Sequence, residues 1–165
     1  MSKVPTDTIA SSILDAAKET LSNPFIVELM TRKVKFENWL QVELARRLSS
    51  SKDFTAVHME GSAENGQAVD LKCQLVDGSC VGVEIKMYVC GKAVSNTRES
   101  IAKDIQKLQQ LCGGGFVLVA VYGYREASKD RSNALLRVEE ALKPLKTYPK
   151  STQDVDLYVA RVEGA

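Results

Sequence analysis

Two alternating runs of apolar residues, joined by a short turn sequence, constrain the fold of this chain more than any other feature. The runs cover residues 69–76 and 80–88, and Asp77-Gly78-Ser79 between them has the residue types of a tight turn. Because side chains point alternately to the two faces of a strand, each run has one apolar and one polar face. The pattern predicts a β-hairpin with one buried face.

The apolar faces of the two runs set the expected register of this hairpin. A three-residue loop at 77–79 makes every cross-strand pair on the buried face apolar, whereas a one-residue slip would not. The expected pairs are Leu75 with Val81, Cys73 with Val83, Leu71 with Ile85 and Val69 with Met87. The same register places Asp70 opposite Lys86, with Glu84 on the same polar face.

Two carboxylates and a lysine on one face of a hairpin suggest phosphate chemistry. Carboxylate oxygens are the ligands that Mg²⁺ prefers, and one or two of them with water and substrate phosphate suffice to hold the ion. Such an ion polarises a phosphodiester and acidifies a bound water, while a lysine orients that water or stabilises developing charge. The alternative is a surface ladder of salt bridges among Asp70, Glu84 and Lys86, and these residues alone leave both interpretations open.

Composition narrows the class of protein. A chain of 165 residues with 44% hydrophobic content is expected to form a single domain, and a net charge of +1 gives no chain-wide attraction for nucleic acid. The four cysteines have no Cys-x-x-Cys spacing, which favours reduced thiols in a cytoplasmic protein. We find neither a secretory signal nor an apolar run long enough for a bilayer, so no membrane association is expected.

The remaining patterns complete an alternation of helices and strands. Helices are expected within 6–21, 24–50, 96–112 and 130–142, and strands over 54–60, 116–122 and 154–162 besides the hairpin. A crossover through the helix at 96–112 would lay strand 116–122 parallel to a hairpin strand. The predicted fold is therefore a three-layer α/β/α domain with a mixed sheet, comprising an N-terminal helical extension (1–35), a core (36–122) and a C-terminal helix and strand (123–165).

Several polar residues outside the hairpin have two interpretations each. Glu37 lies one turn before a stripe of leucines, so it either joins a functional site or is a first-turn glutamate favoured by the helix dipole. Asp104 lies inside an apolar stripe beside two lysines, and an intrahelical ion pair is the expected explanation. Glu60 could join the polar face of the hairpin, and His58 is not expected in the site.

At four places the chain resembles the PD-(D/E)XK nuclease superfamily, whose core is a helix, three antiparallel strands, a helix and a strand. Glu37 matches the glutamate of the first helix, and Asp70 matches the aspartate of the second strand. Glu84-Ile85-Lys86 matches the acidic-x-lysine triplet of the third strand. The helix containing residues 104–108 is similar to the one that follows. The match departs at Val69, where the family has its name-giving proline.

This resemblance implies a site and a reaction. Asp70, Glu84 and the backbone carbonyl of Ile85 would bind Mg²⁺ or Mn²⁺, Lys86 would orient the attacking water, and Glu37 would hold a metal-bound water or a second ion. The reaction would be hydrolysis of a phosphodiester, with DNA as the expected nucleic acid. Phosphate contacts are expected from among Lys72, Lys92 and Arg98.

A second function of another class is compatible with the same resemblance. Some members of this superfamily have kept the core and lost cleavage, and they act as modules that bind nucleic acid or a protein. The near-neutral charge of this chain fits a protein partner, or a second copy of the chain, at least as well as DNA.

Overall fold

The computed structural model describes the chain apart from residues 1–2, 33, 35, 63–67, 91–96 and 124–127. In chain order the elements are α1 (Thr6–Leu21), α2 (Pro24–Thr31), α3 (Glu37–Ser49), β1 (Phe54–Ser62), β2 (Ala68–Leu75), β3 (Cys80–Val89), α4 (Thr97–Gln109), β4 (Gly115–Tyr122), α5 (Ser128–Leu142), β5 (Thr147–Ser151) and β6 (Val155–Val162). Lys92 and the side chain of Glu60, both considered above for the site, lie outside what is described.

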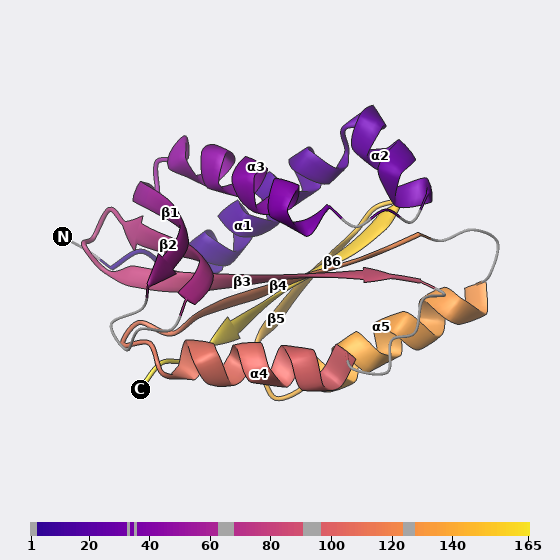
Figure 1. The fold of residues 1–165 in the computed structure, drawn as a ribbon. Helices are drawn as coiled ribbons and strands as arrows, with labels where there is room; N and C mark the ends of the chain where they lie inside the picture. The colour runs from indigo at the N-terminus through magenta and orange to yellow at the C-terminus, as the bar shows by residue number, and fades with distance from the viewer. Residues whose placement is uncertain (1–2, 33, 35, 63–67, 91–96, 124–127) are drawn as a thin grey trace.

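These strands form one sheet in the order β1-β2-β3-β4-β6-β5. β3 and β4 run parallel and are joined through α4, and every other neighbouring pair is antiparallel. Helices α1, α2 and α3 lie on one face of the sheet, and α4 and α5 lie on the other (Figure 1). The predicted α/β class, with helices on both faces of a mixed sheet, is confirmed.

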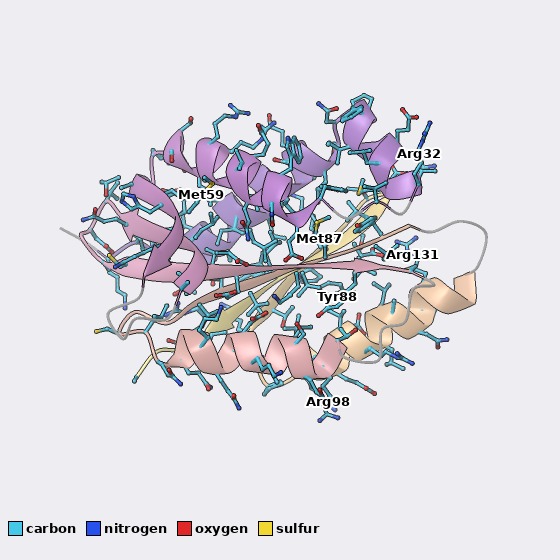
Figure 2. All side chains as sticks on the ribbon, viewed as in Figure 1. Arg32, Met59, Met87, Tyr88, Arg98 and Arg131 are labelled. Atoms are coloured by element: carbon cyan, nitrogen blue, oxygen red, sulfur yellow. The ribbon has the colours of Figure 1, made fainter. Side chains whose placement is uncertain are left out.

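Alternate residues of the central strands supply two apolar cores. On β4, Leu118 packs beneath α1 and α3, whereas Val119 packs beneath α4 and α5. Met87 and Tyr88 point to opposite sides of β3 in the same way (Figure 2). Every residue of β4 is buried, as its nearly continuous apolar sequence predicts for an interior strand.

The β2–β3 hairpin forms with a register that differs from the expected one by two residues. Leu71 pairs with Val83 and Cys73 with Val81, so the predicted pairs, including Asp70 with Lys86, are wrong. The loop is residues 76–78 because Gly78 adopts a positive φ of 85° and the Leu75 N–H donates to the Ser79 carbonyl. Since a shift of two residues preserves the alternation, the apolar side chains of β2 from Leu71 onward and those of β3 still share the expected face.

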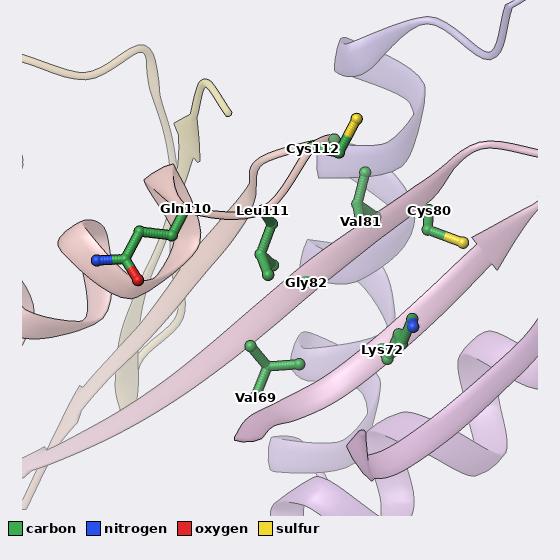
Figure 3. Close-up of a pocket in the computed structure, with 9 residues that line it drawn as sticks. Val69, Lys72, Cys80, Val81, Gly82, Gln110, Leu111 and Cys112 are labelled. Carbon is green, nitrogen blue, oxygen red and sulfur yellow. The ribbon is translucent and has the colours of Figure 1, made fainter. Parts of the chain in front are cut away.

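β2 separates from β3 at the beginning of the hairpin. The pairing between the two strands starts at Leu71, opposite Val83, and Val69 lies outside it. Unlike the other apolar residues of this strand, Val69 packs beneath α4 and α5, where it lines a hollow together with Gly82 (Figure 3). The expected contact of Val69 with Met87 is therefore wrong, and Asp70 lies where the two strands part.

The C-terminal region contains one strand more than the sequence indicates. β6 joins the sheet beside β4, and β5 then adds to the free side of β6 as an edge strand. β5 has the sequence TYPKS, with Pro149 inside it, which is tolerated at an edge because the missing N–H faces no neighbour. Among the described residues, no helix has the length and apolar character needed to cross a membrane.

Candidate functional site

The side chain of Asp70 is fixed at the point where β2 leaves β3. Its Oδ2 accepts a hydrogen bond of 2.7 Å from the backbone N–H of Ile85. The carboxylate thus takes the place of a strand partner for this part of β3. Because the N–H and C=O of one strand residue point to the same side, the Ile85 carbonyl also faces the side on which Asp70 lies.

Glu84 is a buried acid on the face of β3 that α4 covers. It is 1% exposed, and its Oε1 accepts a hydrogen bond of 2.7 Å from Nζ of Lys107 on α4. Burial raises the pKa of Glu84 to about 7; the hydrogen bond from Lys107 opposes this rise, and the negative charge of Asp70 adds to it. A carboxyl group with such a pKa in a site with other charges is a candidate for function.

Lys86 lies two residues further along the same face. Its Nζ is 3.2 Å from Oδ2 of Asp104, a buried residue of α4. Burial acts to lower the pKa of Lys86, but the charge of Asp104, with smaller effects of Glu37 and Asp70, raises it above its ordinary value. The nearby carboxylates therefore outweigh partial burial in setting the pKa of Lys86.

Asp104 was expected to form an ion pair within its own helix, and this is wrong. Its ion pair among the described residues joins α4 to β3 through Lys86. Burial raises the pKa of Asp104, and the charge of Lys86 opposes the rise. The sequence did signal that Asp104 needs a cationic partner, because its carboxylate lies inside the stripe of Ile101, Ile105 and Leu108, but it did not signal which element supplies that partner.

Glu37 approaches the same group from the other helical layer. It is the first residue of α3 and half-buried, and its negative charge contributes to raising the pKa of Lys86 and of Tyr122. The adjoining Phe36 packs against the ring of Tyr122 at a centroid distance of 5.7 Å, which fixes the beginning of the helix over the sheet. Glu37 is therefore a half-buried residue of the first turn of α3 that also lies within electrostatic reach of Lys86, and both interpretations of it stand.

The described residues that were expected to contact phosphate lie in different parts of the structure. Arg98 is exposed in the first turn of α4, and Lys72 lines the hollow between the hairpin and the end of α4 (Figure 3). His58, paired with Lys72 in the β1–β2 ladder, is exposed. Lys107, which was not expected in the site, is the cation that contacts the buried Glu84.

The donor set suits a hard divalent cation only in part. Within the described residues there is no group of three or more His, Cys, Asp or Glu side chains arranged to hold a metal ion. Asp70 and Glu84, with the Ile85 carbonyl, are nevertheless oxygen donors of the kind that Mg²⁺ takes from proteins, which often supply only one or two carboxylates. These residues fit the ion provided that Lys107 moves from Glu84.

Comparison with protein-family models, curated proteins and solved structures gives no match for this chain. Its function must therefore be inferred from the residues of the site.

Proposed function

We propose that this protein is a metal-dependent phosphodiester hydrolase, a nuclease acting on DNA, with Asp70, Glu84 and Lys86 as its reaction centre. The observation that carries the proposal is the buried Glu84 carboxylate, whose pKa near 7 is set by burial beside a second acid. A buried acid of raised pKa lowers the stability of the folded protein wherever it is ionised, so its presence beside the charge of Asp70 is better explained by chemistry.

Each residue of the proposed site has a defined role in this reaction. A Mg²⁺ or Mn²⁺ ion, when bound, would supply electrophilic activation of the phosphodiester and acidify a water. Asp70 and Glu84 would hold it, with the Asp70 carboxylate fixed in direction by the Ile85 N–H. The Lys86 ammonium would orient the attacking water, and Asp104, 3.2 Å from its Nζ, favours the charged form. Glu37 would accept a hydrogen bond from water at the same place.

One observation favours a second function, that of a module that binds nucleic acid or a protein without cleavage. The acids beneath α4 already have cationic partners in the protein, since Glu84 bonds Lys107 and Asp104 pairs with Lys86. Such a network is electrically balanced and would hold α4 on the sheet without any ion.

Metal-dependent stability and cleavage separate the two functions. We expect Mg²⁺ or Mn²⁺ to raise the melting temperature of the unmodified protein and of Asp15→Asn, a control on the exposed side of α1, but not of Asp70→Asn. Single-turnover cleavage is measured with single- and double-stranded DNA and RNA. A binding module would show neither the shift in melting temperature nor cleavage, and that result would refute the nuclease.

A further inference from the structure

We propose that the Lys107 ammonium pairs with Glu84 in the metal-free protein and moves to a nucleic-acid phosphate when a divalent ion binds. This inference rests on the proposed function and deepens it, because it assigns a substrate contact and couples that contact to metal binding. The side chain of Lys107 has two different surroundings.

The first surrounding is the reaction centre. The Lys107 ammonium is 2.7 Å from Oε1 of Glu84, which is itself 1% exposed. Asp70 and Asp104 add to the negative potential there, since each contributes to raising the pKa of Glu84. The ammonium thus stands beside the carboxylate that would hold a metal ion.

The second surrounding is an open groove between α4 and the beginning of β2. Lys107 lines it together with Ala68, Lys103, Gln106 and Gln110. The two lysines and two glutamines recur at intervals of three and four residues, so they share one face of the helix and its end. Ammonium and amide groups in such a row suit the phosphate oxygens of a nucleic-acid strand. The side chain of Lys107 is 28% exposed, so it reaches this groove as well as Glu84.

The type of residue and its geometry allow such an exchange. Lysine is a point charge on a flexible stem, and it contacts Glu84 through a single hydrogen bond. A divalent ion at Asp70 and Glu84 would repel the ammonium, whereas a phosphate in the groove would attract it. Each ligand therefore favours the position of Lys107 that the other needs, which makes their binding cooperative and the coupling reciprocal.

The experiment measures Mn²⁺ affinity from the electron paramagnetic resonance of the free ion, with and without a phosphorothioate oligodeoxynucleotide that resists hydrolysis. The unmodified protein is compared with Lys107→Gln, which can still donate a hydrogen bond to Glu84 but lacks the charge, and with the control Lys18→Gln, at an exposed position of α1 on the opposite face of the sheet. Lys107→Met serves as a second variant for the same position. All measurements are made at a pH well above 7, so that Glu84 is ionised in every protein.

We expect the oligonucleotide to tighten Mn²⁺ binding to the unmodified protein and to Lys18→Gln by about fivefold or more. Lys107→Gln should bind Mn²⁺ more tightly than the unmodified protein without oligonucleotide, and the further gain on adding it should be lost. If Lys107→Gln and Lys107→Met match the unmodified protein in Mn²⁺ affinity and coupling, the inference is overturned while the proposed function stands. If the unmodified protein binds no Mn²⁺ with or without oligonucleotide, the proposed function itself fails.

Discussion

Two buried acids on the same side of the sheet, each held by a helical cation, differ in ways that separate architecture from a candidate site. Asp156 on β6 is 2% exposed, and both of its oxygens accept hydrogen bonds of 2.9 Å from the guanidinium of Arg131 on α5. Glu84 on β3 is 1% exposed, but one oxygen accepts one hydrogen bond from the ammonium of Lys107. The two carboxylates are thus buried to the same extent, but Asp156 is paired through both oxygens and Glu84 through one.

The difference teaches what to look for beyond burial. A planar guanidinium that engages both oxygens of a carboxylate is rigid and leaves little capacity for another ligand. A lysine that engages one oxygen can move, and near Glu84 the charges of Asp70 and Asp104 supply further negative potential. We therefore interpret the pair of Asp156 and Arg131 as an ion pair that holds α5 on the sheet. We interpret the pair of Glu84 and Lys107 as part of a site that can accept a ligand.

The largest expected effect is on cleavage, and it tests this division directly. Lys86→Ala should lower single-turnover cleavage by a factor of about 10² to 10⁴, the usual contribution of a group positioned beside the attacking water. Asp70→Asn should lower it at least as much, because a metal ligand is lost. Lys86→Ala should keep or strengthen metal binding, because it removes a positive charge without removing a ligand, whereas Asp70→Asn should lose it. Asp156→Asn should cleave normally at a temperature where it is folded. Equal cleavage by Lys86→Ala and the unmodified protein would disprove the mechanism.

The next largest effect is on stability and concerns the structural pair. Arg131→Met leaves the Asp156 carboxylate buried without its bidentate partner, and it should lower the free energy of unfolding by about 3 kcal/mol. Arg137→Met, at an exposed position of the same helix, is the matched control and should change it little. Urea denaturation measures both. If Arg131→Met loses no more unfolding free energy than the control, the pair does not stabilise the packing of α5 on the sheet.

The sequence predicted the faces of the strands better than their pairing. Alternation decides which side chains share a face, and it placed Glu84 and Lys86 on the side that α4 covers. Register depends on the turn, where Gly78 takes a positive φ and Asp77 accepts hydrogen bonds from the Ser79 N–H and from the N–H of Val4 near the N-terminus. A contact across such a distance along the chain leaves no local pattern, so the shift by two residues could not be predicted.

The contacts of α4 were only partly predictable for a related reason. That Asp104 needs a partner follows from its apolar neighbours, but which cation supplies it depends on how α4 lies over β3. The contacts of Lys107 with Glu84 and of Lys86 with Asp104 cross between these elements. β5 escaped prediction because an edge strand exposes one side and needs no apolar alternation, and Pro149 argued against a strand.

A smaller effect, on the pH dependence of stability, tests the buried acid of the site. Burial holds the pKa of Glu84 near 7, above its ordinary value of 4.5, so the folded state retains this proton more strongly than the unfolded state does. The associated stability is fully present below about pH 4.5 and is lost as pH rises through about 7, amounting to roughly 2–3 kcal/mol. Glu84→Gln cannot ionise and should lack this loss.

Urea denaturation at several pH values between 4 and 8 gives the comparison. The free energy of unfolding of the unmodified protein should fall relative to that of Glu84→Gln between about pH 4.5 and 7 and then run parallel to it. A constant difference across this range would mean that Glu84 keeps an ordinary pKa, and the contrast with a merely structural acid would disappear.

The smallest effect concerns a cation and an acid that meet without burial. Lys150 of β5 pairs with Asp15 of α1, and their side chains are 34% and 62% exposed. Because water screens both charges, Lys150→Ala should lower the free energy of unfolding by less than about 1 kcal/mol, and moderate salt should remove most of that loss. Lys143→Ala, at an exposed position just after α5, is the control for the loss of one positive charge. If Lys150→Ala instead cost as much as Arg131→Met and did so independently of salt, contact alone would stabilise as strongly as buried bidentate pairing, and the distinction drawn between the two buried acids would lose its physical basis.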